Sequence, residues 1–337
     1  MSVATLPVAA LAAILAASAA AVWFAGAPLA RSTDALSTRF GLGEALGGLL
    51  LLAVATNLPE AAIVASAALR GDMPMAVGNL LGGVAAQTLV LVAIDRWGVR
   101  TGAPLMTQAA TPALAVEALL VIAVLILVGV GRQLAPATAI GPLSAGDLML
   151  PASWLAGVVA IDRLRPPLGA TETAASRSKG STSAAAAAFA VASLATMAGG
   201  VGLEVAGDAL AKRLGIDGVL FGATVLAAAT SLPELSTGIA AARAGERELA
   251  VSDILGGNAV LPVMLVMASL LAWRSAFADI DPISLLLCGL GVVMTAVVAA
   301  AGAIRSPRRV LGVGAEGIVL IVAYALGIAA IPLTHIN

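Results

Sequence analysis

The sequence predicts an all-α polytopic membrane protein, with ten transmembrane helices arranged as two inverted five-helix repeats. Three observations carry this prediction: an apolar composition, long continuous apolar runs, and internal similarity between the two halves of the chain. Of the 337 residues, 60% are hydrophobic and 11% are charged, whereas soluble domains have about 25% charged residues. This composition excludes an ordinary soluble enzyme and a disordered chain, and the net charge of −1 excludes a basic nucleic-acid binder. A lipid bilayer is the expected environment, and nucleic acid is not an expected partner.

Ten apolar runs are long enough to cross a bilayer as helices. A helical span needs about 20 apolar residues, whereas a transmembrane β-barrel would show alternating segments of about ten residues. The first run resembles a signal peptide in its alanine content, but no Lys or Arg precedes it, so we expect it to be retained. The predicted spans are residues 4–29, 41–69, 73–94, 105–131, 139–161, 183–210, 216–243, 248–273, 281–304 and 309–333.

One polar segment divides the chain into halves with five spans each. Residues 163–182 are rich in proline, serine and basic side chains, and they separate a first repeat (1–162) from a second repeat (183–337). When alternate loops are grouped by side, one side holds 13 Lys and Arg residues and the other holds 5. Because basic loops stay in the cytoplasm, the linker is expected there and both termini are expected to be extracytoplasmic. The prediction is a multi-pass protein of the cell (inner) membrane; the sequence sets no oligomeric state, and a monomer is the simplest expectation.

The two halves share a motif that aligns without a gap. Residues 39–83 match residues 213–257 position by position, and both segments contain Thr-x-Leu-Pro-Glu followed by a Gly-Gly pair. Because each half has an odd number of spans, the second half enters the membrane from the opposite side. Inverted repeats of this kind are typical of secondary transporters, whose sites lie near the midplane where helices are interrupted.

Two prolines are expected to interrupt spans near their middle. Pro59 and Pro233 each remove one backbone hydrogen bond. The freed carbonyls, around Thr56 and Thr230, can coordinate a cation. Irregular backbone at this depth is tolerated only where it is buried in protein or lines a cavity.

Carboxylates within the predicted spans indicate a cation site. Each one costs at least about 2.5–3.5 kcal/mol on insertion scales, so each needs a compensating role. Glu60 and Glu234 follow the prolines directly, Asp253 and Asn79 occupy equivalent positions in the next spans, and four further polar residues lie about one turn before the glutamates. The candidate metal ligands are Glu60, Glu234, Asp253, Asn79, Thr56, Thr230, Ser231 and Asn57.

This candidate set contains only oxygen ligands, which suits hard cations such as Ca²⁺, Na⁺ or Mg²⁺. The chain has one cysteine and one histidine, so neither a disulfide nor a thiolate or imidazole metal site is expected. No cofactor is expected beyond the transported ions, Ca²⁺, Na⁺ and H⁺. The alternative interpretation is that these polar groups serve helix packing. Other acidic residues, Glu117, Asp147, Glu204, Asp208 and Glu316, are expected to be paired, interfacial or at the rim of a cavity.

The motifs Thr-Asn-Leu-Pro-Glu and Thr-Ser-Leu-Pro-Glu, with Val-Gly-Asn-Leu-Leu-Gly-Gly and Val-Ser-Asp-Ile-Leu-Gly-Gly-Asn, resemble the two α-repeats of the cation/calcium exchanger superfamily. The prokaryotic sodium/calcium exchangers are the most similar branch. The resemblance implies a core of spans 2, 3, 7 and 8, with spans 1 and 6 as a sliding gating pair. It also implies roles for the candidate residues. Glu60 and Glu234 would be central calcium ligands, Thr56 and Thr230 would supply carbonyls, Asn79 and Asp253 would complete the site, and Ser231 with Asn57 would line sodium sites.

The sequence departs from this superfamily at several hydroxyl positions. Glycines Gly83 and Gly257 stand where serine is usual, and Val84 replaces an asparagine that survives in the second half as Asn258. Met75 and Leu249 lie one turn before Asn79 and Asp253, where a hydroxyl could bind sodium. The loss of hydroxyls favours proton coupling or a changed ion preference.

The predicted function is a secondary active cation antiporter that exports Ca²⁺ in exchange for Na⁺ or H⁺ by alternating access. One alternative is an antiporter for another cation, Na⁺/H⁺ or Mg²⁺. A second alternative is an intramembrane lipid-phosphate enzyme, which should hold an arginine near its acids. The nearest arginines along the chain, Arg70 and Arg243, are ten residues from Glu60 and nine from Glu234. This spacing disfavours the enzyme.

Overall fold

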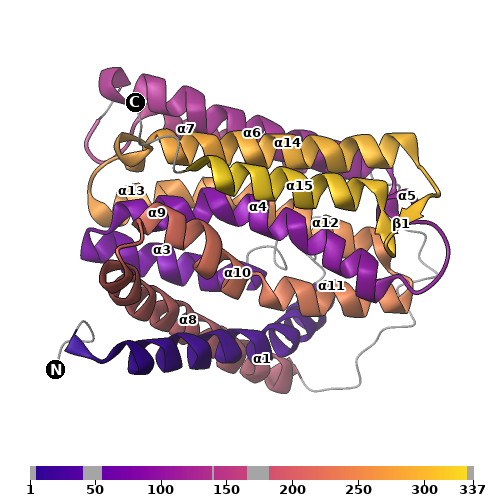
Figure 1. Ribbon diagram of the computed structural model, residues 1–337, viewed down its shortest axis with the longest axis horizontal. Coiled ribbons are helices and arrows are strands. Elements are labelled where there is room, and N and C mark those ends of the chain that lie inside the picture. The colour runs from indigo at the N-terminus through magenta and orange to yellow at the C-terminus, as the bar shows by residue number, and fades with distance from the viewer. Residues whose placement is uncertain (1–4, 41–54, 139, 165–181, 332–337) are drawn as a thin grey trace.

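The computed structural model describes residues 5–40, 55–138, 140–164 and 182–331, and these residues form an α-helical bundle (Figure 1). The first half contains α1 (Val8–Phe40), α3 (Leu58–Arg70), α4 (Met73–Gly98), α5 (Leu105–Ala109), α6 (Pro112–Thr138) and α7 (Ala145–Leu164). The second half contains α8 (Thr182–Leu214), α9 (Gly218–Phe221), η3 (Gly222–Leu226), α10 (Ala227–Thr230), α11 (Leu232–Ala244), α12 (Arg247–Val260), η4 (Leu261–Met264), α13 (Leu265–Ala272), η5 (Ala276–Asp279), α14 (Pro282–Ile304) and α15 (Ala315–Ala330).

A two-stranded antiparallel hairpin joins α14 to α15. Strands β1 (Arg309–Val310) and β2 (Val313–Gly314) pair Arg309 with Gly314 and Val310 with Val313. The turn between them includes Gly312 at φ +84°, a conformation in which glycine carries no steric penalty.

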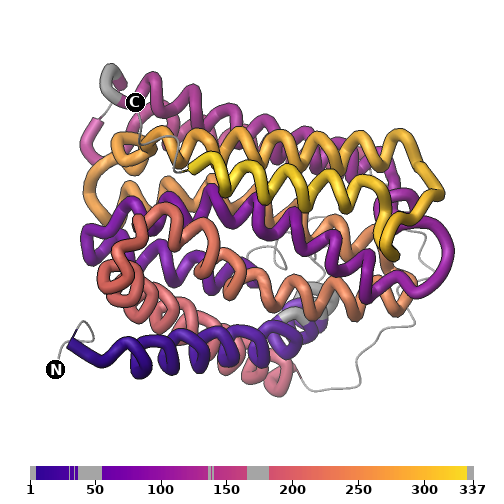
Figure 2. The backbone as a smooth tube through the Cα atoms, in the orientation of Figure 1, coloured from indigo at the N-terminus to yellow at the C-terminus, as the bar shows by residue number. Residues whose placement is uncertain are grey.

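The helices are arranged in three groups. Helices α1 and α8 lie side by side along one edge, and α6, α7, α14 and α15 occupy the opposite edge (Figures 1 and 2). Between them lie α3, α4 and α9 to α12. Helix α4 is central, because it contacts α3, α11, α12, α14, α15 and η3. The polar residues predicted to bind a cation belong to this middle group.

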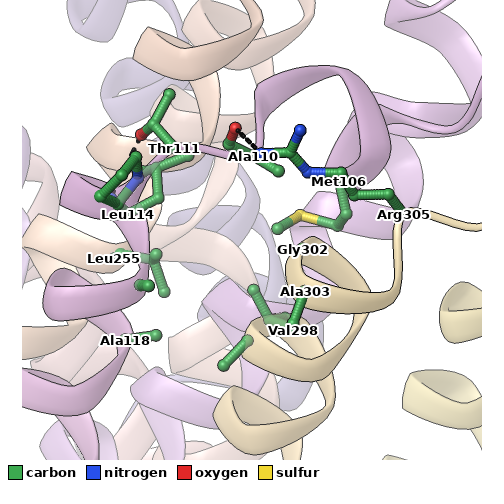
Figure 3. A pocket seen from close by; sticks show the side chains of 13 residues that line it. Met106, Ala110, Thr111, Leu114, Ala118, Leu255, Val298, Gly302, Ala303 and Arg305 are labelled. Atoms are coloured by element: carbon green, nitrogen blue, oxygen red, sulfur yellow. Dashed lines mark hydrogen bonds between the residues drawn. The ribbon is translucent and has the colours of Figure 1, made fainter.

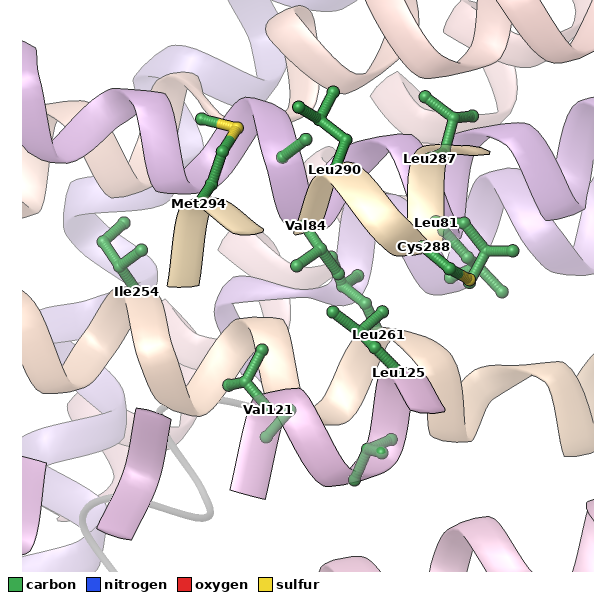
Figure 4. Packing of buried hydrophobic residues seen from close by; sticks show 14 of the residues in the cluster. Leu81, Val84, Val121, Leu125, Ile254, Leu261, Leu287, Cys288, Leu290 and Met294 are labelled. Carbon is green, nitrogen blue, oxygen red and sulfur yellow. The ribbon is translucent and has the colours of Figure 1, made fainter. Parts of the chain in front are cut away.

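The core is packed from aliphatic side chains of α4, α6, α12 and α14 (Figure 4). Leu81 and Val84 of α4 are fully buried, as are Val121 of α6 and Met294 of α14. Cys288 is a free thiol and a buried member of the same cluster. Its role is that of a small apolar side chain.

Seven helices in the described residues are long and apolar enough to cross a membrane, and an eighth span is counted if one bent pair is joined. The bent pair is Gly218–Thr230 with Leu232–Ala244, and Ala315–Ala330 is a shorter apolar helix. The predicted span 41–69 falls partly outside the described residues, as does most of the predicted linker 163–182. A multi-span, all-α membrane protein is therefore confirmed, while the count of ten stays a prediction.

Prolines also divide two runs that the sequence predicted as single spans. The run 105–131 contains α5 and α6, and Pro112 is the first residue of α6. The run 248–273 contains α12, a short 3₁₀ segment with Pro262, and α13. In each case proline removes a helical backbone donor and favours an interruption.

Glycines allow α4 to lie directly against the start of the bent pair. A Cβ atom at Gly78 would lie 2.6 Å from the carbonyl oxygen of Val219. A Cβ atom at Gly222 would lie 2.9 Å from the backbone nitrogen of Asn79. Both distances are too short for a side chain, so the two backbones make contact only because both positions are glycine.

At each end of the bundle, side-chain contacts connect segments that are far apart in the sequence. At one end, Arg309 pairs with Asp95 at 2.7 Å, and Arg305 donates to the carbonyl of Ala110 at 3.0 Å. At the other end, Arg70 pairs with Asp208 at 3.1 Å. These contacts join loops that the alternate-loop grouping assigned to the same side.

An ionic network ties the end of α3 to α8. The Arg70 guanidinium lies 3.4 Å from Glu204 and 3.1 Å from Asp208, and Lys212 pairs with Asp208 at 2.6 Å. Ser66 donates to Glu204 at 2.6 Å. In the loop before α4, burial raises the pKa of Asp72 above its ordinary value, and a hydrogen bond and the charge of Asp208 raise it further.

Replacing Arg70 with methionine is expected to destabilise the protein. The Glu204 side chain is fully buried, and Arg70 is its cationic partner. Loss of such a partner costs about 1–3 kcal/mol or more. Thermal unfolding in detergent should show a lower midpoint for Arg70→Met, while the exposed Arg100→Met variant should match the wild type. Equal midpoints for the two variants would show that the network adds no stability.

Candidate cation site

Each of the two predicted glutamates lies at the start of a helix that follows an interruption of the helical backbone. Glu60 is in the first turn of α3, after Asn57, and Glu234 is in the first turn of α11, after Ser231. The segments before and after Ser231 meet at 41°. Helix N-termini carry partial positive charge, so they stabilise carboxylates in this position. Each glutamate is 1% exposed.

The prolines account for these breaks. Pro59 and Pro233 each stand at the second position of their helix, where a missing N–H is tolerated. On the N-terminal side of the second break, and separated from it by α10, Gly222–Leu226 forms a π-helical turn. Such turns are frequent at functional sites. The predicted interruptions at the two prolines are thus present in the structure.

The Glu60 carboxylate contacts residues from both halves of the chain. Gln87 of α4 donates to Glu60 Oε1 at 3.2 Å, and the Thr230 hydroxyl lies beside the same carboxylate. Glu234 lies within electrostatic range of Glu60 and Asp253. Glu234 is thus the common electrostatic neighbour of the other two predicted carboxylates.

Asn79 and Asp253 lie on the two helices that follow the glutamates. Thr237 of α11 donates to Asp253 Oδ2 at 3.3 Å. The Asn79 amide is fully buried in α4, and its backbone lies against Gly222. Asp253 and Asn79 thus occupy buried positions on α12 and α4, as their equivalent places in the repeat predicted.

The predicted hydroxyl residues are buried at the two breaks. Thr230 donates to the carbonyls of Leu226 and Ala227, and Ser231 donates to Ala227 at 2.6 Å. Thr56 is 2% exposed, and Asn57 is fully buried, with its amide beside Gly257. Because the hydroxyl protons of Thr230 and Ser231 are donated back along the helix, their oxygen lone pairs remain available to a cation.

Several buried oxygens in this region have no hydrogen-bond partner among the described residues. They are Glu60 Oε2, both carboxylate oxygens of Glu234, Asp253 Oδ1, Asn79 Oδ1, Gln87 Oε1 and Asn258 Oδ1. Buried polar atoms are normally hydrogen-bonded, so such a concentration needs an explanation. Oxygens of this type are the ligands that hard cations prefer. In the described part of the chain, however, no three or more carboxylate, histidine or cysteine side chains are grouped closely enough to hold an ion alone. Amide and backbone oxygens would have to complete a coordination shell.

Three polar residues near this cluster were not among the predicted ligands. Gln87 contacts Glu60, Thr237 contacts Asp253, and Thr88 accepts a hydrogen bond from Asn258 at 2.9 Å. Gln87 and Thr88 are a polar pair inside an apolar run, and that pattern was visible in the sequence. The repeat alignment did not indicate them, because Leu261 and Pro262 stand at the equivalent positions.

A cavity of about 410 Å³ lies elsewhere, between α5, α6, α12 and α14 (Figure 3). Its wall includes Met106, Leu114, Leu255 and Val298, and Arg305 reaches across to Ala110 (Figure 3). The eight predicted ligands are not part of its lining. An apolar wall with a guanidinium does not suit a cation.

Most of the other acidic residues have partners, as expected. Asp147 accepts from Ser144, Ser269 and Ser275, and Glu117 accepts from Ser252 at 2.9 Å. Glu204 and Asp208 belong to the Arg70 network. Their partners are serine and basic side chains that do not belong to the predicted ligand set.

Comparison with known proteins identifies the family. The family model described as "Sodium/calcium exchanger protein" matches residues 10–159 and 184–331, which is most of the chain. The chain belongs to the sodium/calcium exchanger protein family. It is therefore a multi-pass membrane transporter of the cation/calcium exchanger superfamily, with inorganic cations as substrates, and not an enzyme.

Related proteins share the fold at low sequence identity. The structure of native YfkE superposes with a TM-score of 0.66, 16% identity, and coverage of 94% of this chain and 91% of that one. The sodium-calcium exchanger NCX_Mj superposes with a TM-score of 0.63 at 15% identity, and the match covers 96% of this chain and 99% of that one. The H⁺/Ca²⁺ exchanger CAX superposes with a TM-score of 0.65 at 12% identity, and the match covers 96% of this chain and 88% of that one. The inner membrane protein YrbG of Escherichia coli (strain K12) is 37% identical over 75 residues, a match that spans 22% of each chain. At these identities, the solved structures establish the fold and leave the coupling ion open.

Proposed function

We propose that this exchanger moves Ca²⁺ out of the cell in exchange for Na⁺ or H⁺, with the ions binding in turn at the cluster around Glu60 and Glu234. The observation that carries the proposal is the pair of buried glutamates at two helix breaks, surrounded by oxygens without hydrogen-bond partners among the described residues. The proposed ligands are Glu60, Glu234, Asp253, Asn79, Thr56, Thr230, Ser231 and Asn57. The two glutamates supply the charge that balances one Ca²⁺.

We further propose that residues 1–162 and 183–337 form inverted five-span repeats. Equivalent contacts support this arrangement. Gly26 of α1 lies against Pro233 of α11, and Gly200 of α8 lies against Pro59 of α3. In the register of the repeat, the two glycines are equivalent to each other, and so are the two prolines. Each of these contacts joins one half to the other, as a pseudo-twofold axis requires. Matches to the same family model on either side of the linker agree with two repeats.

In this proposal, α1 and α8 form the gating pair, and they expose the cluster to one side of the membrane at a time. Ca²⁺ and the counter-ion compete for the same carboxylates, so only loaded states change conformation. Binding and conformational preference are then linked by differential affinity for the two states. The contacts at the two ends of the bundle support the grouping of alternate loops on one side. The proposed orientation, with the linker in the cytoplasm and both termini outside it, rests on the distribution of basic residues between the two sides. The assembly we propose is a monomer in the cell (inner) membrane.

Proton coupling is the second candidate for the counter-ion. Met75, Leu249, Gly83 and Gly257 carry no hydroxyl, which leaves fewer neutral ligands for Na⁺. The buried carboxylates can release and take up protons without additional ligands. A proton-coupled exchanger needs only Glu60, Glu234 and Asp253 for this exchange.

The test is ⁴⁵Ca²⁺ uptake into proteoliposomes loaded with Na⁺ and diluted into Na⁺-free buffer at matched pH. Uptake that requires internal Na⁺ supports sodium coupling. Uptake driven by an inside-acidic proton gradient in the absence of Na⁺ supports proton coupling instead. A protein that responds to neither gradient, while transporting another cation, would overturn the assignment of Ca²⁺.

A further inference from the structure

The cavity between α5, α6, α12 and α14 is an apolar groove with polar groups at one end. Arg305 and Thr111 lie at that end, and Ala118 and Val298 lie at the other (Figure 3). From Arg305 to Val298 the groove follows α14 for about two turns, or about 10 Å. Its volume of about 410 Å³ is large enough for a small organic molecule. The shape and lining therefore suit a ligand with a charged head and an apolar tail.

The groove opens toward the face of the bundle that lies against lipid. Pro112, Ala115 and Ala303 line it and are exposed. Helices α6 and α14 are both long and apolar enough to cross a membrane. Exposed side chains beside the groove on these helices are large and apolar, with Leu119 61% and Ile304 75% exposed. In a bilayer these faces contact acyl chains, so the groove is accessible to lipid from within the membrane.

Arg305 supplies the positive charge at the end of the groove. It follows α14 at φ +53°, and its Nη2 reaches across to donate to the carbonyl of Ala110 at 3.0 Å. The other guanidinium N–H groups have no hydrogen-bond acceptor in the described part of the chain. Glu248, a carboxylate on the same rim, accepts from the Thr111 hydroxyl at 3.0 Å. A guanidinium with unused donors is well suited to bind a phosphate group.

Small side chains line the groove where the other half of the protein has larger ones. Helices α6 and α14 both begin with proline, and aligning these prolines pairs the two helices residue by residue. The larger counterparts belong to the packed core or lie against it. In this alignment Ala110, Ala115 and Ala118 correspond to Ile280, Leu285 and Cys288. The groove is thus a feature of one half of the chain and does not follow from the repeat.

We propose that this groove binds an anionic phospholipid of the bilayer, with one acyl chain between α6 and α14 and the phosphate at Arg305. The loop that contains Arg305 belongs to the basic side in the grouping of alternate loops, which is the side proposed as cytoplasmic. Anionic lipids make the cytoplasmic surface negative, and basic pockets between membrane helices on that side bind their headgroups. An apolar wall favours a lipid over a water-soluble phosphate, because it gains from burying hydrocarbon.

The test is equilibrium binding of tritium-labelled phosphatidylglycerol to purified, delipidated protein in detergent. We expect saturable binding that unlabelled phosphatidylglycerol displaces. Phosphatidylcholine with the same acyl chains tests the need for net negative charge, and glycerol 3-phosphate tests the need for a chain. Each of these two competitors should be at least tenfold less effective than phosphatidylglycerol.

Two variants alter opposite ends of the ligand. Arg305→Gln removes the charge at the groove, and it should raise the dissociation constant of phosphatidylglycerol at least tenfold. Its matched control is Arg308→Gln, which removes the same charge from an exposed side chain outside the lining and should change that constant less than threefold. The double variant Ala110→Ile/Ala115→Leu fills the groove with the side chains of the other half, and it should also weaken binding at least tenfold. Thermal unfolding confirms that each variant is folded, and if one is not, the other still tests the site.

Three results would overturn the proposal. Equal losses from Arg305→Gln and Arg308→Gln would indicate general attraction of anionic lipid to a basic surface. Undiminished binding by a folded, groove-filled variant would mean that the acyl chain lies elsewhere. Failure of the wild type to bind phosphatidylglycerol saturably, or equal displacement by phosphatidylcholine, would remove the anionic lipid itself. None of these measurements involves Ca²⁺, so their outcome is independent of the proposed function.

Discussion

Replacing either Glu60 or Glu234 with glutamine is expected to reduce calcium exchange to the level of protein-free liposomes. Each substitution keeps the size and shape of the side chain and one acceptor oxygen, replaces the other oxygen with an NH₂ donor, and removes one negative charge. The two glutamates are buried within electrostatic range of each other, and in the proposed site each contributes half of the charge that balances Ca²⁺. An oxygen cluster with one carboxylate fewer leaves a divalent ion with uncompensated positive charge in a low-dielectric region, which is strongly unfavourable.

The measurement is ⁴⁵Ca²⁺ uptake by proteoliposomes, normalised to the amount of folded protein. Glu117→Gln is the matched control, because Glu117 is also a buried glutamate in the bundle, yet it is held by Ser252. We expect that variant to transport at close to the wild-type rate. Normal exchange by either Glu60→Gln or Glu234→Gln would show that the ions bind elsewhere.

The second large effect concerns folding. Gly78→Ala is expected to destabilise the protein by about 3 kcal/mol, the upper end of the usual cost of overpacking a core. The added methyl group would lie 2.6 Å from the carbonyl oxygen of Val219 and 2.7 Å from its Cα. Both are backbone atoms, so no rotamer change can relieve the overlap, and α4 would have to move away from α9.

Gly129→Ala provides the comparison, because a Cβ atom at that position meets nothing within 4 Å. Alanine has a higher helix propensity than glycine, by about 1 kcal/mol, so this variant should be as stable as the wild type or more stable. Thermal unfolding in one detergent measures both variants. A Gly78→Ala midpoint equal to the wild type would mean that α4 and α9 are further apart than described.

The sequence predicted the features that repeat. The alignment of the two halves paired Pro59 with Pro233 and Glu60 with Glu234, and proline chemistry placed the helix breaks beside the acids. Apolar run length alone predicted a multi-span membrane protein, because hydrocarbon thickness fixes the length of a span. These inferences depend on local chemistry, so they did not require knowledge of the packing.

What the sequence did not predict depends on contacts between distant segments. Gln87 has no polar counterpart in the second half, so the alignment of the two repeats did not identify it as a site residue. The salt bridges of Arg70 with α8 join segments that are far apart along the chain, and no local pattern pairs them. The π-turn at Gly222–Leu226 begins with a glycine that lies against the backbone of α4, and the helical periodicity of the run encodes neither the turn nor this contact.

The burial of α4 has a consequence for how the protein is made. In the most apolar 18-residue window of this helix, 89% of the window is buried inside the protein. Many of the neighbours that bury it come from the second half of the chain, namely η3, α9, α11, α12 and α14. While the ribosome is still synthesising that second half, the amides of Asn79 and Gln87 face lipid or transient neighbours. Helix α4 therefore reaches its final environment only after α14 has been inserted. A first half expressed alone would leave this helix without most of its partners, and we expect such a fragment to be degraded in the cell.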